Sequence, residues 1–308
     1  MNLLVGATGF VGGHVVEYLF EQGEISKGLF RSGAHLKILD ACGVQSVEAD
    51  LLARHDLDGA MDGVDTVYSM ASPMPFGDED FARVNTVGIR NLLKAAEEAR
   101  VKAIVHLSTL DVYGFRNRVV TTANRVSPSG PYQESKLEAD RLILEFAETN
   151  EDTKAVIVRV ARAFGSRDPS LATPLLRMIE GGAVVLPASS VSMSFTHPRD
   201  IAQAMYKATT AHVRSGKVFL VKSFDAAPDE LASSLSSSLQ LTPREKKHGL
   251  FSKSLLPRYT LDQLRAGLSI EAQKDWDELG YSPAYDLRKT CEEVAHWYHK
   301  EPWVVEEA

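Results

Sequence analysis

The chain of 308 residues carries 34 basic and 41 acidic side chains, which gives a formal net charge of -7. A net acidic chain with no long basic block does not favour nucleic acid as a partner. The 44% hydrophobic and 24% charged residues are ordinary for a globular protein, and the length suffices for one large domain or two smaller ones.

The first residues, MNLLVGATGF, lack a basic segment and reach Gly6 early, so they predict neither a signal peptide nor a membrane span. Cys42 and Cys291 are widely separated and have no metal-ligand spacing. They predict neither a disulfide framework nor a metal site, and they agree with a reducing, cytoplasmic location.

Short apolar segments alternate with amphipathic stretches from the first residue onward. Strands are predicted at residues 2–6, 25–31, 43–50, 64–72, 102–109 and 153–161, with helices at residues 11–23, 79–99 and 131–149. Strands that alternate with helices indicate parallel βαβ units. The fold class is therefore α/β, with a doubly wound parallel sheet that binds ligands at its carboxyl edge.

Beyond residue 165 this alternation weakens, and the pieces become shorter and richer in proline. Residues 195–222 then return to a helix followed by a strand. The pattern predicts a larger domain over residues 1–165, joined again by residues 195–222, and a smaller interleaved region over residues 166–194 and 223–308. Within the latter, residues 232–240 are rich in serine and predict a weakly amphipathic helix.

A glycine-rich turn follows the first predicted strand and opens a helix at once. Gly6, Gly9 and Gly12 are spaced by three residues. Glycines at such a turn let backbone amides approach a pyrophosphate, and the helix N-terminus favours the anion. In a βαβ context this arrangement predicts that the larger domain binds a dinucleotide. The expected contacts of the turn are Gly6, Thr8, Gly9, Phe10, Val11 and Gly12.

The end of the second predicted strand bears on the choice between the two nicotinamide cofactors. An acid placed there usually binds the ribose hydroxyl of NAD, but this chain has Phe30, Arg31 and Ser32. A guanidinium presents a fork of donors that suits a phosphate. Arg31 therefore favours NADP(H), with NAD(H) as the alternative if this arginine is simply a solvated surface residue.

Two further segments are expected to contact the cofactor. Asp50 and Leu51 follow the third strand and are placed to meet the adenine, although a turn aspartate and a core leucine would look the same. After the fourth strand, small residues lie where the chain would pass under the cofactor. These are Met70, Ala71, Ser72 and Pro73.

Tyr132 and Lys136 lie in the sequence GPYQESKLEAD, at the start of a predicted helix. Residues four apart on a helix share one face, so both side chains can point into the same cleft. An ordinary pair of surface residues would have the same spacing.

Together these segments resemble the extended short-chain dehydrogenase/reductase superfamily, also called the NAD-dependent epimerase/dehydratase family, over nearly the whole chain. Residues 8–13 are similar to its TGxxGxxG fingerprint apart from the last glycine, and residues 131–136 match its PYxxSK signature. NTVGIRN, STLDVYG and FTHPRDIA resemble three further family elements. The resemblance implies a Rossmann-type sheet. Arg31 and the absence of a GxGxxR run look more like the dihydroflavonol reductase and 3-beta-hydroxysteroid dehydrogenase branches. RVARAFGS, with Val160 and Arg162, departs from the family's RPxNVYGP.

The resemblance also implies catalytic roles. Tyr132 would exchange a proton with the substrate oxygen, and Lys136 would hold the nicotinamide ribose. A cation about 4 Å away contributes on the order of 4 kcal/mol, enough to bring a phenol from its pKa of about 10 toward neutrality. Thr109, or its neighbour Ser108, would bind the substrate oxygen. Asn85 would help to relay protons, although it also fits a loosely packed helix.

The substrate end is harder to define. An apolar pocket is expected from Pro73, Met74, Phe76, Phe164 and Phe195, all of which are equally suited to a core. Arg162 is placed either to meet an anionic substrate group or to pair with a nearby acid. His197 is expected to be structural, since it has no metal-ligand partner at useful spacing.

The leading interpretation is an NADP-dependent oxidoreductase that interconverts a carbonyl and an alcohol on a moderately apolar small molecule. A nucleotide-sugar epimerase or dehydratase using NAD is the first alternative. The second is a sensor that binds NADP without catalysis, as in relatives that lack the tyrosine. The helices predicted at residues 79–99 and 131–149 pair with their copies in relatives, so a homodimer is expected.

Overall fold

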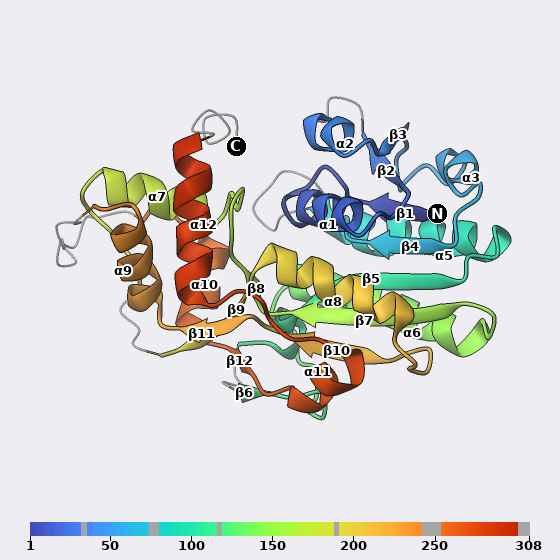
Figure 1. The fold of residues 1–308 in the computed structure, drawn as a ribbon. Coiled ribbons are helices and arrows are strands. Elements are labelled where there is room, and N and C mark those ends of the chain that lie inside the picture. The colour runs from blue at the N-terminus through green and yellow to red at the C-terminus, as the bar shows by residue number, and fades with distance from the viewer. Residues whose placement is uncertain (32–35, 74–79, 116–118, 188–190, 242–253, 301–308) are drawn as a thin grey trace.

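A computed structural model describes residues 1–31, 36–73, 80–115, 119–187, 191–241 and 254–300. Two expected substrate contacts, Met74 and Phe76, lie outside the described residues. Figure 1 shows a broad sheet flanked by helices, with a smaller group of helices and strands beside it.

The large sheet has seven strands, all parallel, in the order β10-β7-β5-β4-β1-β2-β3. They are β1 (Asn2–Val5), β2 (Ser26–Phe30), β3 (Gln45–Glu48), β4 (Thr66–Ser69), β5 (Ala103–Thr109), β7 (Lys154–Val160) and β10 (Val218–Val221). The chain fills the sheet outward in opposite directions from β1 and β4. The crevice at the carboxyl ends of these two strands is therefore the switch point where doubly wound sheets bind ligands. The predicted α/β class and all six predicted strands are confirmed.

Alternate strand residues face two separate cores, because successive side chains of a strand point to opposite faces. Leu3 and Ile104 lie in one core, whereas the next residues, Leu4 and Val105, lie in the other. The first core is covered by α5 (Ile89–Glu98) and α6 (Pro131–Thr149), and the second by α1 (Phe10–Glu21) and α8 (Pro198–Thr210) (Figure 1). Burial on both faces explains why the strand segments are almost continuously apolar. Shorter helices are α2 (Lys37–Ala41), α3 (Asp56–Ala60) and α11 (Gln273–Leu279).

The smaller part contains a three-stranded sheet of β11 (Phe224–Ala226), β9 (Met193–Thr196) and β8 (Arg162–Ala163). Its helices are α7 (Ala172–Glu180), α9 (Pro228–Ser238), α10 (Arg258–Ala266) and α12 (Leu287–Lys300). A two-residue pairing joins β12 (Ser269–Ile270) to β6 (Val119–Val120). Within the returning segment 195–222, β10 belongs to the large sheet and α8 packs against that sheet, whereas β9 belongs to the small sheet. The proposed domain boundaries remain a prediction.

The helix predicted at residues 79–99 is irregular. It consists of α4 (Phe81–Arg83), a π-helical turn η1 (Val84–Gly88) and then α5. Asn85 and Gly88 are poor helix formers, which agrees with a departure from α-helical geometry here. A side chain at Gly88 would lie 3.2 Å from Leu51 Cβ, so glycine allows η1 to pack closely. Among the described residues, no helix has the length and apolar character needed to cross a membrane.

Candidate active site

A cavity of about 420 Å³ lies at the carboxyl ends of the strands of the large sheet. Every residue predicted to bind the cofactor lines it: Gly6, Thr8, Gly9, Phe10, Val11, Gly12, Arg31, Asp50, Leu51, Met70, Ala71 and Ser72. Pro73 and four of the expected catalytic residues, Ser108, Thr109, Tyr132 and Lys136, line the same cavity. The fold therefore joins the glycine turn and the Tyr-Lys pair, which are far apart in the sequence.

Two of the three glycines of the turn, Gly6 and Gly12, leave no room for a side chain. Gly6 has a φ of +91°, and a Cβ there would lie 2.7 Å from the Ala71 backbone nitrogen. A Cβ on Gly12 would lie 1.9 Å from the Gly6 carbonyl oxygen. Gly6, Gly9 and Gly12 thus fit all three glycines of the fingerprint, with Val5 in place of its threonine. This register corrects the alignment that starts at Thr8.

The opposite end of the cavity holds the residues expected near the adenosine. Arg31 is exposed at the end of β2, whereas Leu51 is buried beneath the cavity. The Asp50 carboxylate accepts a hydrogen bond from the Leu52 amide at 2.9 Å, so it shapes its own turn as well as lining the cavity. The glycine turn at residues 6–12, Arg31 and the turn at Asp50 together suit the binding of a dinucleotide.

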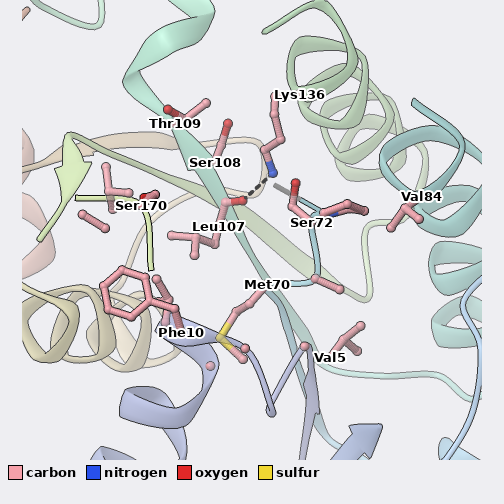
Figure 2. Close-up of a pocket in the computed structure, with 18 of the residues that line it drawn as sticks. Val5, Phe10, Met70, Ser72, Val84, Leu107, Ser108, Thr109, Lys136 and Ser170 are labelled. Carbon is pink, nitrogen blue, oxygen red and sulfur yellow. Dashed lines mark hydrogen bonds between the residues drawn. The ribbon is translucent and has the colours of Figure 1, made fainter. Parts of the chain in front are cut away.

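Lys136 lies at the reaction end, on the second turn of α6. Its ammonium donates a hydrogen bond at 3.0 Å to the carbonyl of Leu107, which precedes Ser108 and Thr109 on β5 (Figure 2). The residue is only 4% exposed. Burial lowers the pKa of Lys136 to about 8, and the nearby Asp140 acts in the opposite direction.

Tyr132 is half-buried on the first turn of α6. Burial raises the pKa of its phenol to about 12, and Asp111 acts in the same direction, while Ser72 and Arg162 oppose it. Lys136 is not among the groups that shift this pKa, so the expected lowering of the Tyr132 pKa by Lys136 is not found. Desolvation outweighs the charges nearby, and the phenol is protonated at neutral pH.

Two hydroxyls lie at the end of β5 where the substrate oxygen is expected. Thr109 Oγ1 accepts a hydrogen bond from the Asp111 amide at 3.1 Å, and its own hydrogen remains available to donate. Ser108 Oγ is buried and has no hydrogen-bond partner among the residues that the structure describes. Both hydroxyls border the cavity, so the structure retains both candidates.

Asn85 lies in η1 behind the cavity rather than in its wall. Its side-chain amide donates to Ser135 Oγ at 3.0 Å, and this hydroxyl donates to the Tyr132 carbonyl at 2.8 Å. The chain of bonds fixes the backbone of Tyr132. Asn85 is thus connected to the first turn of α6 through the Ser135 hydroxyl, which bonds the Tyr132 carbonyl.

Three polar residues that the sequence analysis missed complete the substrate end. Asp111 Oδ2 accepts hydrogen bonds from Tyr259 Oη at 2.8 Å and from Gln263 Nε2 at 2.7 Å, and all three residues line the cavity. Burial raises the pKa of Asp111, while these two hydrogen bonds oppose the shift. Helix α10, from the C-terminal part of the chain, thereby forms one wall of the site.

A second cavity, of about 660 Å³, adjoins the first and shares Tyr132 and Tyr259 with it. Phe81 and Phe115 also line it. Ring centroids are 5.3 Å apart for Tyr132 and Tyr259, 5.7 Å for Tyr132 and Phe81, and 6.1 Å for Phe115 and Tyr259. The rings of Phe81, Phe115, Tyr132 and Tyr259 therefore form one aromatic wall of the second cavity.

Arg162 lines the first cavity but is already paired with an acid. Its Nη2 lies 3.3 Å from Asp168 Oδ2 and also donates to Ser170 Oγ. Asp168 is fully buried. The second of the two predicted alternatives, pairing with a neighbouring acid, therefore describes Arg162.

Phe164 and Phe195 do not lie in either cavity, contrary to the expectation that they contact substrate. Both are fully buried in the core of the smaller part, with centroids 6.1 Å apart, and Phe195 stacks on Phe224 at 5.6 Å. His197 stacks on Tyr285 at 3.6 Å. The three phenylalanine rings thus belong to the core of the smaller part, and His197 lies outside both cavities at the start of α8.

The fold is that of a Rossmann-type protein, and its glycine turn lines the same cavity as Tyr132 and Lys136. Residues 2–221 match the NAD dependent epimerase/dehydratase family, and the chain belongs to this family. The predicted resemblance to the extended short-chain dehydrogenase/reductase superfamily is confirmed.

Relatives within the family differ in activity. Sterol-4-alpha-carboxylate 3-dehydrogenase, decarboxylating, of Bos taurus is 30% identical over 186 residues, 58% of this chain and 51% of that protein. The chain thus spans about half the length of this relative. N-acetyl-alpha-D-glucosaminyl-diphospho-ditrans,octacis-undecaprenol 4-epimerase of Escherichia coli O157:H7 is 29% identical over 60% of this chain and 55% of its own length.

The fold also matches solved structures. UDP-glucuronic acid 4-epimerase of Bacillus cereus, solved in complex with NAD, superposes with a TM-score of 0.82. The match covers 97% of this chain and 99% of that one at 20% sequence identity, so it supports the fold alone.

Proposed function

We propose that the protein is an NADP(H)-dependent oxidoreductase that interconverts a carbonyl and an alcohol on a moderately apolar small molecule. One observation carries the proposal: Tyr132, Lys136 and the Ser108 and Thr109 hydroxyls line the same cavity as the glycine turn. Such a cavity can hold a dinucleotide with its reactive end beside a proton donor.

The residues take distinct roles. A bound nicotinamide would supply or accept the hydride. Tyr132 is protonated at neutral pH because burial raises its pKa, which suits donation of a proton to a carbonyl oxygen during reduction. Thr109 or Ser108 would donate a hydrogen bond to the same oxygen and stabilise its developing charge. Lys136 would bind the ribose and supply positive charge near the phenol.

The aromatic wall supports an apolar substrate. Its four rings line the second cavity, and one of them is the ring of the proposed proton donor, Tyr132. Rings of this kind favour the burial of flat or cyclic apolar groups over that of charged ones. Arg162 is held by Asp168, so it supports an anionic substrate less well than its position in the sequence indicates.

Arg31 supports the preference for NADP(H), since it is exposed at the end of β2 and lines the cavity. A guanidinium there can bind a 2'-phosphate through paired hydrogen bonds. Steady-state KM values for the two cofactors test this assignment, and equal or better use of NAD would reject it.

Activity is tested by NADPH oxidation with a panel of cyclic ketones and aldehydes. Tyr132→Phe should lower kcat at least 100-fold, since it removes the proton donor, while NADPH still binds. Tyr206→Phe is the matched control, because its hydroxyl contacts Glu24 at 3.4 Å and lies outside the cavity. Turnover that survives Tyr132→Phe unchanged would reject the mechanism.

The epimerase or dehydratase reading remains the second candidate, favoured by the Asp111 carboxylate in the cavity wall. A carboxylate can accept hydrogen bonds from sugar hydroxyls, and one curated relative is named as an epimerase. Tightly retained NAD, together with turnover of UDP- or dTDP-sugars and no net NADPH oxidation, would establish this function instead.

We also propose a homodimer in which η1, α5 and α6 pack against their copies. Val87 on η1 is 39% exposed, which leaves an apolar side chain available on this face. Light scattering after size-exclusion chromatography gives the mass of the assembly, and a monomer at micromolar concentration would exclude this interface.

A further inference from the structure

A buried ionic network lies directly beneath Lys136. Asp140, one helical turn further along α6, is fully buried, and its Oδ2 accepts a hydrogen bond from Arg159 Nε on β7 at 2.9 Å. Arg159 also donates to Tyr113 Oη at 2.9 Å. Arg159 on β7 therefore holds the carboxylate, and Tyr113 on η2 (Leu110–Tyr113) holds the guanidinium of Arg159 in turn.

The other carboxylate oxygen has no such partner. Asp140 Oδ1 is buried, and among the described residues it makes no hydrogen bond. His106 Nε2 lies 3.9 Å away and is also buried without a partner, while Nδ1 of the same ring lies 3.0 Å from Ser69 Oγ. A carboxylate oxygen left without a strong partner keeps its negative charge available to nearby cations.

We propose that Asp140 is a positioning residue that keeps Lys136 in its charged form inside a dry site. The inference rests on the role proposed above for Lys136. Residues four apart on a helix have Cβ atoms about 5–6 Å apart, close enough for one buried charge to act on another. Without Asp140, burial would lower the pKa of Lys136 further, so that more of the amine would be neutral near pH 8.

Other charged groups around Lys136 do not replace this carboxylate. His106, facing it from β5, has a pKa well below its usual value because of burial, with Lys136 and Arg159 adding to the effect, so it is neutral. Arg159 on β7 is a cation and opposes a second positive charge. On η1, α4 and α5 the charged residues, such as Arg83 and Arg90, are exposed. Tyr113 and Tyr132 have raised pKa values, chiefly through burial, and are neutral phenols.

A purely structural ion pair between Asp140 and Arg159 is the competing explanation. The two differ in how their effects depend on pH. Loss of a structural pair weakens the site equally at every pH, whereas loss of a counter-ion moves the pH at which Lys136 loses its proton. A unit charge at about 6 Å and an effective dielectric near 20 shifts a pKa by about two units, and sharing with Arg159 reduces this to about one.

The test follows NADPH binding by fluorescence from pH 6.5 to 9.5, without turnover. In the unmodified protein the Kd should be constant at low pH and rise above about pH 8, where burial places the pKa of Lys136. Lys136→Met should abolish this rise. Asp140→Asn, with Asp140→Ser as a second neutral variant, should move it about one pH unit lower. The Kd at pH 8 would then weaken roughly fivefold to tenfold, with less than a twofold change at pH 6.5.

Two variants control for charge and burial. Asp140→Glu retains the charge and should restore the original midpoint. Asp275→Asn alters another buried aspartate, which accepts the Leu220 amide at 3.0 Å, and should leave the midpoint unchanged. An unshifted midpoint in the neutral variants, or an equal loss of affinity at every pH, would overturn the inference. If the unmodified protein shows no rise that Lys136→Met removes, the proposed role of Lys136 itself fails.

Discussion

Substitution of Gly12 by alanine tests whether the tight glycine turn is needed for cofactor binding. The added Cβ would lie 1.9 Å from the Gly6 carbonyl oxygen and 2.8 Å from its carbon, both of them backbone atoms. Backbone atoms cannot rotate away, so α1 would have to move by about 1 Å from the turn that follows β1. Overpacking of this kind costs about 1–3 kcal/mol in unfolding free energy. The same shift would move the N-terminus of α1 away from the position expected for the cofactor pyrophosphate. We therefore expect NADPH affinity to fall at least tenfold.

Urea unfolding and NADPH fluorescence titration measure the two effects separately. Gly59→Ala is the matched control: this glycine lies within α3, has nothing within 4 Å of an added Cβ, and should be neutral or slightly stabilising in alanine form. If Gly12→Ala unfolds at the same urea concentration as the unmodified protein and binds NADPH equally well, the argument from close packing is refuted.

Two further substitutions test the substrate wall and the junction between the two parts of the protein. Phe115→Ala removes one ring of the aromatic wall. It should raise the KM for 4-phenylcyclohexanone several-fold and leave the KM for cyclohexanone unchanged. Equal effects on both ketones would contradict an apolar subsite. Burial acts to raise the pKa of Glu293, but contacts with His197 and Ser166 outweigh it and lower the pKa to about 2. A carboxyl group with a lowered pKa stabilises the fold above pH 4.5, and this stabilisation is lost as the pH falls toward 2. The unfolding free energy of the unmodified protein should therefore fall between pH 5 and pH 3. Urea unfolding should show this fall to be smaller in Glu293→Gln, by on the order of 2 kcal/mol. An unchanged acid dependence would show that this carboxylate is not responsible.

The sequence was sufficient for the fold and for the cofactor side of the cavity because both depend on local signals. Apolar strands, intervening helices and a glycine turn follow one another in chain order, and each signal is complete within a few residues. The spacing of Tyr132 and Lys136 likewise placed both residues in one cavity.

The substrate side depends on contacts that no short segment contains. Tyr259 and Gln263 reach Asp111 across 148 and 152 positions of the chain, and no spacing rule connects them. Phe164 and Phe195 show the opposite error, since an aromatic residue in a sequence is equally compatible with a core and with a pocket. The pKa of Tyr132 depends on how deeply the phenol is buried, which helical spacing does not determine.

The origin of Tyr259 in a late segment has a consequence for biosynthesis. During translation the large sheet and the glycine turn can form before α10 leaves the ribosome, because contacts within that sheet need no residue beyond β10. At that stage the cavity beside the glycine turn would still lack the wall that Tyr259, Thr260 and Gln263 of α10 form. The cavity is thus completed only after the large sheet has formed, when α10 packs against it.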